Sequence, residues 1–279
     1  MQLLITETRS ELINKIVRTL ELQTHEIADI VELYYDCQKM RIAHANKDRS
    51  EAPSELVQWL DFWMHAGESV IQGKLKKWVT SERAPEQAKW AYDQVGIGPV
   101  LASGLAAHID IEKAQSISAV WKFAGLAPGF DRKIKGNKLA YNARLKTLCW
   151  KLGESFVKVS AKPDATYGKL WAEFKREEIA RNDAGKYAAA AAAQLAAKKF
   201  KVAEVKKTLE SGRLTDAHLH ARSKRRAVKI FLAHYWTVGR EAAGLAVREP
   251  YAKTILGHDG IIESHRDRAT HVIEASQKK

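Results

Sequence analysis

The part of the chain with the clearest chemistry is a glycine-rich turn at residues 95–102, with the sequence VGIGPVLA. Gly96 and Gly98 can adopt positive φ angles, which permits a tight reversal and lets a ligand approach the backbone closely. Pro99 suits the first position of a helix, and the unpaired N–H groups and positive dipole end of that helix attract anions. With the amphipathic stretch 84–94 before it, the pattern predicts a helix-hairpin-helix turn that binds a phosphate without reading bases.

Two basic clusters downstream of the turn supply further phosphate contacts. The first cluster lies between residues 131 and 151 and contains a predicted turn, Lys135-Gly136-Asn137-Lys138. The second cluster lies between residues 222 and 229, on one helix whose opposite side is apolar. The alternative interpretation of the glycine turn is a turn that only packs two helices, and the alternative interpretation of the second cluster is a solvated helix face. The expected nucleic-acid contacts are Gly96, Ile97, Gly98, Val100, Arg132, Lys133, Lys135, Lys138, Arg144, Lys146, Arg222, Lys224, Arg225, Arg226 and Lys229.

The charge of the chain is segregated along its length. The 279 residues carry a formal net charge of +13, with a pI of about 9.6. Residues 1–90 hold 12 Lys and Arg against 14 Asp and Glu, so residues 91–279 carry a net charge of +15. Such a basic region favours a polyanionic partner, and DNA is expected, with RNA as the alternative.

Cysteine usage and hydropathy restrict the compartment. Cys37 and Cys149 are the two cysteines and lie far apart in the chain, so they provide no disulfide framework. The first residues lack the pattern of a secretory signal, and no apolar run reaches 18 residues. We therefore expect a cytoplasmic protein without a membrane partner, either nucleoid-associated or encoded by a phage.

Hydrophobic residues recur with helical spacing through the chain, and alternation typical of strands is absent, so the sequence predicts an all-α fold. Residues 6–46 read as one long helix, with Thr8 and Glu11 as a capping box. A polar break at 46–53 and a cap at Ser54 precede a second long helix. The two long helices are expected to form an antiparallel, coiled-coil-like helical hairpin over 1–83. Its apolar stripe is either part of the core or the seam of a homo-oligomer.

The remaining chain divides into three predicted parts. Residues 84–163 form the helix-hairpin-helix nucleic-acid-binding domain. Residues 164–212 form a long helical arm that Gly185 interrupts. Its alanine run at 188–193 is expected to be exposed, because alanine has high helix propensity but buries little area. Residues 213–279 hold the second basic helix and a helical tail that packs on the core.

Three ordered motifs give a resemblance to a known family. They are Gly96-Ile97-Gly98-Pro99, the Phe-Ala-Gly-Leu-Ala-Pro segment at 123–128, and Gly136-Asn137 followed by a basic helix with Arg144 and Lys146. Over residues 90–160, and again at 220–236, the chain resembles the C-terminal domain of the insertion-sequence transposases that carry an N-terminal RuvC-like nuclease domain with four acidic residues, also known as bridge-RNA-guided recombinases. The resemblance implies a DNA-binding role in recombination on a mobile element or phage.

Two departures from that family bear on catalysis. The RuvC-like domain begins with strands that hold a catalytic Asp, whereas residues 1–90 are predicted to be helical and resemble the coiled-coil segment that joins the two halves of the family. The family's recombining serine follows the Gly-Leu-Ala-Pro segment, whereas residues 129–137 contain no Ser or Thr. We therefore expect no catalytic residues and no cofactor.

Other residues offer alternative chemistry. Ser155 and Ser223 are alternative nucleophiles, and His218, His220 and His234 with Cys149 are alternative metal ligands, but loop histidines without a ligand are commoner. Asp110 and Glu112 either bind a cation or end a helix. The paired aromatics at Tyr141 and Trp150, and at Tyr235 and Trp236, stack on bases or belong to the core.

Together these patterns predict a transposase-like protein that binds nucleic acid, double-stranded DNA in the first place, without its own strand-cleavage site. One alternative is an active recombinase or nuclease whose acidic residues come from a partner, with Mg²⁺ as its cofactor. Another is an architectural protein whose arm at 165–209 bridges subunits.

Overall fold

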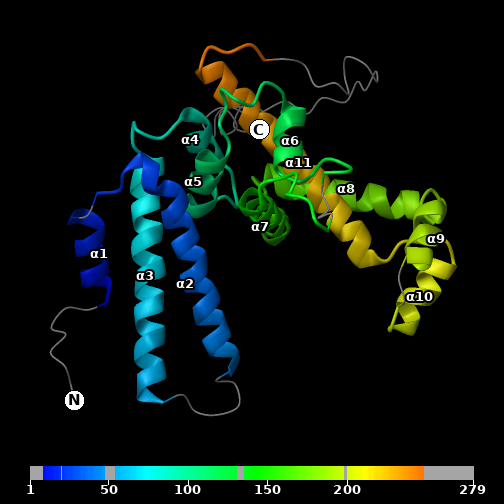
Figure 1. Cartoon of the computed structure of the whole chain (residues 1–279), viewed down its shortest axis with the longest axis horizontal. Coiled ribbons are helices and arrows are strands. Elements are labelled where there is room, and N and C mark those ends of the chain that lie inside the picture. The colour runs from blue at the N-terminus through cyan, green and yellow to red at the C-terminus, as the bar shows by residue number, and fades with distance from the viewer. Residues whose placement is uncertain (1–8, 20, 48–53, 131–134, 198–199, 248–279) are drawn as a thin grey trace, which may run out of the picture. The chain divides into compact units, whose positions relative to one another are not determined.

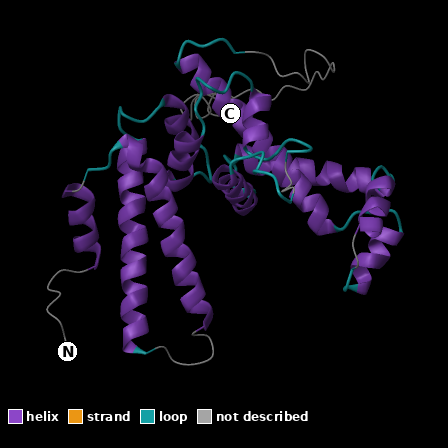
Figure 2. Cartoon of the chain, in the orientation of Figure 1, coloured by secondary structure: helices purple, strands orange, loops and turns teal. Residues whose placement is uncertain are grey.

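The computed structural model describes residues 9–19, 21–47, 54–130, 135–197 and 200–247, and every regular element in these ranges is helical (Figures 1 and 2). The all-α fold predicted from the sequence is therefore confirmed for the part of the chain that the structure describes. The elements are α1 (Arg9–Thr19), η1 (Thr24–Glu26), α2 (Ile27–Lys47), α3 (Glu55–Val79), α4 (Glu86–Asp93), α5 (Pro99–His108), α6 (Ile117–Phe123), α7 (Ala143–Val159), α8 (Thr166–Asp183), α9 (Ala188–Ala197), α10 (Ala203–Glu210) and α11 (Asp216–Ala242).

The chain forms two compact units. The first contains residues 1–92 and 98–113, and the second contains residues 93–97 and 114–279. In the first unit α2 and α3 lie side by side, and both pack against α5, while α1 packs on α3 (Figure 1). Leu75 and Val79 are fully buried in this unit, and Arg41 binds Glu68 at 2.6 Å across α2 and α3.

The first long helix is not continuous, contrary to the sequence-based expectation for residues 6–46. It is divided into α1 and α2, with a short 3₁₀ turn before α2. Gln23 is extended, with φ −89° and ψ 147°, and its N–H donates to the Glu26 carboxylate at 2.8 Å. This local hydrogen bond starts a new helix at the turn, so α1 packs on α3 as a separate element; Thr8 of the expected capping box lies outside the described residues.

The second unit is organised around α11, the longest of its described helices, against which α6, α7 and α8 pack (Figure 1). Phe156 of α7, Tyr167 of α8 and Phe231 of α11 form an aromatic cluster, with ring centroids 5.1 to 5.6 Å apart. The Tyr167 hydroxyl and His234 Nδ1 share a hydrogen bond of 2.7 Å. These contacts fix α7 and α8 against α11, so the charged side chains that the helices carry have defined positions.

Residues 164–212 form three helices. Gly185 has a φ of +72°, a conformation that favours glycine, and it ends α8 before the alanine-rich α9. The alanine run is exposed except for Ala191, which is buried with Leu209, Leu214 and Leu219 in a small apolar cluster. α9 therefore packs on α10 and is not part of one straight arm.

Among the described residues, no helix is both long enough and apolar enough to cross a lipid bilayer.

Two helical glycines provide a matched test of packing. At Gly168 of α8 a Cβ would lie 2.7 Å from the Cα of Ser160 and 2.9 Å from the Phe156 carbonyl oxygen, whereas at Gly67 of α3 nothing lies within 4 Å. We expect Gly168→Ala to lower the free energy of unfolding by about 1–3 kcal/mol, because the added methyl group would collide with the backbone of α7 and force it to shift. Gly67→Ala should raise it by up to about 1 kcal/mol through helix propensity. Urea unfolding followed by circular dichroism measures both, and equal changes for the two variants would contradict the close α7–α8 approach.

Candidate nucleic-acid interface

The glycine turn is fixed on α7. Gly96 has a φ of +96°, and a Cβ there would lie 3.0 Å from Cγ2 of Val159. The Ser155 hydroxyl donates a hydrogen bond to the Gly96 carbonyl oxygen. Ser155, an alternative nucleophile in the sequence, therefore makes a structural hydrogen bond that holds the turn.

The start of α5 is more open. Gly98 is its N-cap, with φ −90° and ψ 171°, and Pro99 occupies the first turn. A Cβ at Gly98 would meet nothing within 4 Å, whereas the side chains of Ile97 and Val100 are buried. Of the predicted contacts in this turn, Ile97 and Val100 therefore have only backbone groups to offer a ligand.

The solvent-facing side of α7 is basic. Between residues 143 and 159 the chain has four bases and a single acid, Glu154. Arg144, Lys151 and Lys158 are seven residues apart, so they lie along one side of the helix, while Leu145, Leu152 and Phe156 are buried on the other. We call Arg144, Lys151 and Lys158 the α7 stripe.

The α7 stripe contains two residues that are not among the contacts predicted from the sequence, Lys151 and Lys158. The signal that identifies them is the seven-residue spacing on a helix whose other side is apolar. Burial, and then the nearby charge of Lys158, lower the pKa of Lys151. The smaller of these two effects reflects the proximity of two positive charges on this side of α7.

The segment that precedes α7 adds exposed bases. Lys135 and Lys138 are exposed around Gly136, whose φ is +88°. Arg132 and Lys133 lie outside the described residues. Lys146 is half-buried, with its ammonium 4.1 Å from the centre of the Tyr141 ring, so it packs on the aromatic face.

The bases of α11 have a different environment. Arg222 binds Glu178 at 2.7 Å, Arg226 binds Glu177 at 2.8 Å, and Lys224 forms an ion pair with Glu154. The Lys229 ammonium lies 4.1 Å from the centre of the Trp121 ring, and burial lowers its pKa. Arg225 is exposed. Three of the five predicted α11 contacts are thus engaged in ion pairs with acids on α7 and α8.

Glu178 is central to the ion pairs of α11. Its side chain is fully buried, and its carboxylate accepts hydrogen bonds from the Tyr187 hydroxyl at 2.6 Å and from Arg222. Burial alone would raise the pKa of Glu178, but these hydrogen bonds and the charges of Arg222 and Arg226 outweigh it and hold the pKa below its ordinary value. The carboxylate therefore stays ionised between α8 and α11.

The residues considered for other chemistry are dispersed. Ser223 is buried and donates to the Leu219 carbonyl at 2.9 Å, and burial raises the pKa of Cys149 to about 12. Asp110 accepts hydrogen bonds from two backbone N–H groups after α5 and binds Lys113 at 2.8 Å, as a helix-ending turn does. Among the described residues, no three His, Cys, Asp or Glu side chains are grouped as metal ligands.

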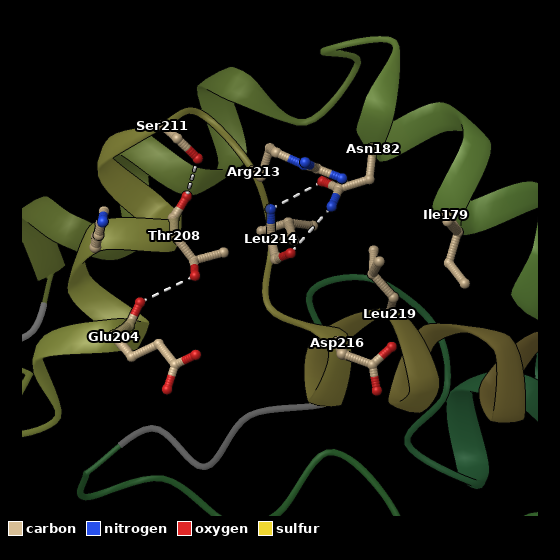
Figure 3. Close-up of a pocket in the computed structure, with 10 residues that line it drawn as sticks. Ile179, Asn182, Glu204, Thr208, Ser211, Arg213, Leu214, Asp216 and Leu219 are labelled. Atoms are coloured by element: carbon tan, nitrogen blue, oxygen red, sulfur yellow. Dashed lines mark hydrogen bonds between the residues drawn. The ribbon is translucent and has the colours of Figure 1, made fainter.

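An open cleft of about 550 Å³ lies between α8, α10 and the start of α11 (Figure 3). Figure 3 shows the amide of Asn182 bonded to both backbone groups of Leu214, to the N–H at 2.8 Å and to the carbonyl at 3.0 Å. The wall of the cleft carries acids and bases together, with Glu204 and Asp216 beside Lys207 and Arg213. None of the predicted nucleic-acid contacts lines this cleft.

Comparisons of the chain with protein-family models, with curated protein sequences and with solved structures give no match.

The buried carboxylate permits a direct test of the α8–α11 contact. Glu178→Ala leaves Arg222 and Arg226 without their shared partner, so we expect the free energy of unfolding to fall by about 3–5 kcal/mol. Because the native pKa of Glu178 lies below its unfolded value of about 4.3, its stabilisation is present above that value and is lost as the pH falls through the native pKa. Urea unfolding between pH 3 and 7, about the range over which glutamates titrate, measures both effects.

Glu177→Ala is the matched control, because Glu177 is partly exposed and its pairs with Arg226 and Arg181 are solvated. Its removal should cost no more than about 1 kcal/mol. Similar losses of stability in the two variants would show that burial of Glu178 is not the source of its effect.

Proposed function

We propose that the chain binds nucleic acid, double-stranded DNA in the first place, through the phosphates. The observation that carries this proposal is the α7 stripe, three bases along one side of a helix, together with the exposed Lys135 and Lys138 in the segment that precedes this helix. Binding of this kind depends on counterion release and carries little sequence information. The concentration of the positive charge in residues 91–279 supports the same partner.

The open backbone at Gly98 gives a second, separate phosphate site. The first N–H groups of α5 follow a glycine N-cap and a proline, which is a favourable place for a phosphate oxygen. No side chain caps this helix, so its N-terminal N–H groups have no competing side-chain acceptor at the N-cap.

The order of the glycine turn, the Gly-Leu-Ala-Pro segment and the basic helix supports a transposase-like origin for this binding function. In this proposal the chain binds DNA without its own strand-cleavage site and belongs to a mobile element or phage. The first unit would form a homo-oligomer, since Leu56, Trp59 and Trp63 are exposed on α3.

Removal of the α7 stripe is the experiment that tests the proposal. In the triple variant Arg144→Ala, Lys151→Ala and Lys158→Ala, the affinity for a labelled DNA duplex should fall. The slope of log K against log salt should become shallower by roughly 0.9 for each phosphate that the variant no longer neutralises. Fluorescence anisotropy over a salt series measures both quantities.

A second triple variant, Lys39→Ala, Lys76→Ala and Lys77→Ala, is the matched control for the stripe. It removes exposed bases of α2 and α3 and should leave both the affinity and the salt slope unchanged. No duplex binding by the natural chain at low salt would end the proposal.

The contribution of the glycine turn is tested at Gly98. Valine readily adopts the backbone angles of Gly98, and its side chain enters open space, so Gly98→Val should fold normally. It should weaken duplex binding severalfold, because the side chain obstructs the approach of a phosphate to the backbone. Substitution at Gly96 is less informative, since its positive φ and its proximity to Val159 would strain the turn. Unchanged affinity with an unchanged melting temperature would exclude this turn as a phosphate site.

A further inference from the structure

Trp150 is the most exposed aromatic side chain among the described residues, with 61% of its surface accessible. It follows Leu148 and Cys149, which are buried, and it lies on the solvent-facing side of α7. A tryptophan offers a large, flat apolar ring, and an exposed ring can accept a planar group on its face.

The surroundings of Trp150 are cationic. The Lys224 ammonium lies 5.9 Å from the centre of the indole ring and also pairs with Glu154, the single acid of α7. Lys151, the central residue of the α7 stripe, follows Trp150 directly in the chain. An aromatic ring among bases suits a polyanion with flat apolar groups, which is the chemistry of a nucleic-acid strand.

We propose that the α7 face binds unpaired nucleotides, with a base stacked on the indole of Trp150 and the adjacent phosphates on the α7 stripe. This inference rests on the proposed function and adds to its phosphate contacts with a duplex a mode of binding for unpaired nucleotides. A base inside a duplex is covered on both faces by its neighbours, so only an unpaired or extruded base can present a face to Trp150.

Exposed aromatic side chains also lie in the segments next to the N-terminal end of α7. The N–H of Asn142, the N-cap of α7, donates to the Phe123 carbonyl at 2.8 Å, which places Phe123 at the start of the helix. Phe123 and Phe130 are both exposed, and the Lys122 ammonium lies 5.0 Å from the centre of the Phe130 ring. Trp150 lies eight residues beyond Asn142, about 12 Å along the helix. Exposed aromatic side chains thus lie both on α7 and in the segments next to its start.

The test compares single-stranded and duplex probes on the full chain. A fluorescein-labelled oligothymidylate of about 20 nucleotides, the matching oligouridylate and a duplex of the same length are titrated by anisotropy. Trp150→Ala should weaken binding of the single-stranded probes about tenfold, Trp150→Phe should keep most of the affinity, and the duplex affinity should change less than about twofold. Val202→Ala, which removes an apolar side chain of similar exposure (59%) at the N-cap of α10, is the matched control and should leave the affinity for every probe unchanged.

The two single-stranded probes distinguish a DNA source of the nucleotides from an RNA source, and dependence on Trp150 with either one supports the proposal. Equal loss of single-strand and duplex affinity in Trp150→Ala would overturn it, as would a natural chain that binds the duplex but neither single strand. Absence of binding to every probe would refute the proposed function itself. Unchanged affinity combined with a changed oligomeric state in light scattering would overturn it too and assign the face to a protein partner. Photocrosslinking of 5-iodouridine-labelled probe to the peptide that contains Trp150 would give direct support.

Discussion

The second unit depends on one buried charge. The Glu178 carboxylate lies inside the protein with no exposed surface, and an isolated carboxylate in that position would be strongly unfavourable. Arg222 and Arg226 of α11, together with the Tyr187 hydroxyl, supply the donors that keep it ionised. The relative position of α8 and α11 is thereby fixed by an interaction that tolerates little displacement, since a half-satisfied network is costly.

The same interaction divides the positive charge of the chain into two populations. Bases that are paired with Glu154, Glu177 and Glu178 hold helices together, whereas Arg144 and Lys158 of the α7 stripe are exposed on a helix with one acid. A net charge taken from the sequence does not separate these two uses. Part of the net charge is therefore used in helix packing, and α7 with the segment before it retains exposed bases.

The sequence predicts the helical class, the capping residue Ser54 and the glycine breaks, because these depend on local spacing and backbone preference. It does not predict which acids meet the bases of α11, since Glu178 is 44 residues from Arg222 and the pairing arises from helix packing. The division of the first helix at Gln23 is not predicted either, because it goes with a single hydrogen bond from the Gln23 N–H to the Glu26 carboxylate inside an otherwise continuous helical pattern. The exposure of Trp150 likewise depends on which side of α7 packs on α11, and periodicity alone does not decide between core and surface there.

The bonds between Asn182 and Leu214 have a consequence for how the chain can vary in length. Together with the ion pair between Asp183 and Arg213, they join the end of α8 to the segment that leads into α11. The segment between these residues, which includes α9 and α10, is an insertion whose two ends are held together by these hydrogen bonds and this ion pair. Because the entropic cost of closing a loop grows slowly with its length, the segment can change in length while α8 and α11 keep their alignment, provided that Tyr187, a donor to Glu178, is retained. This segment is thus a natural place for an inserted module.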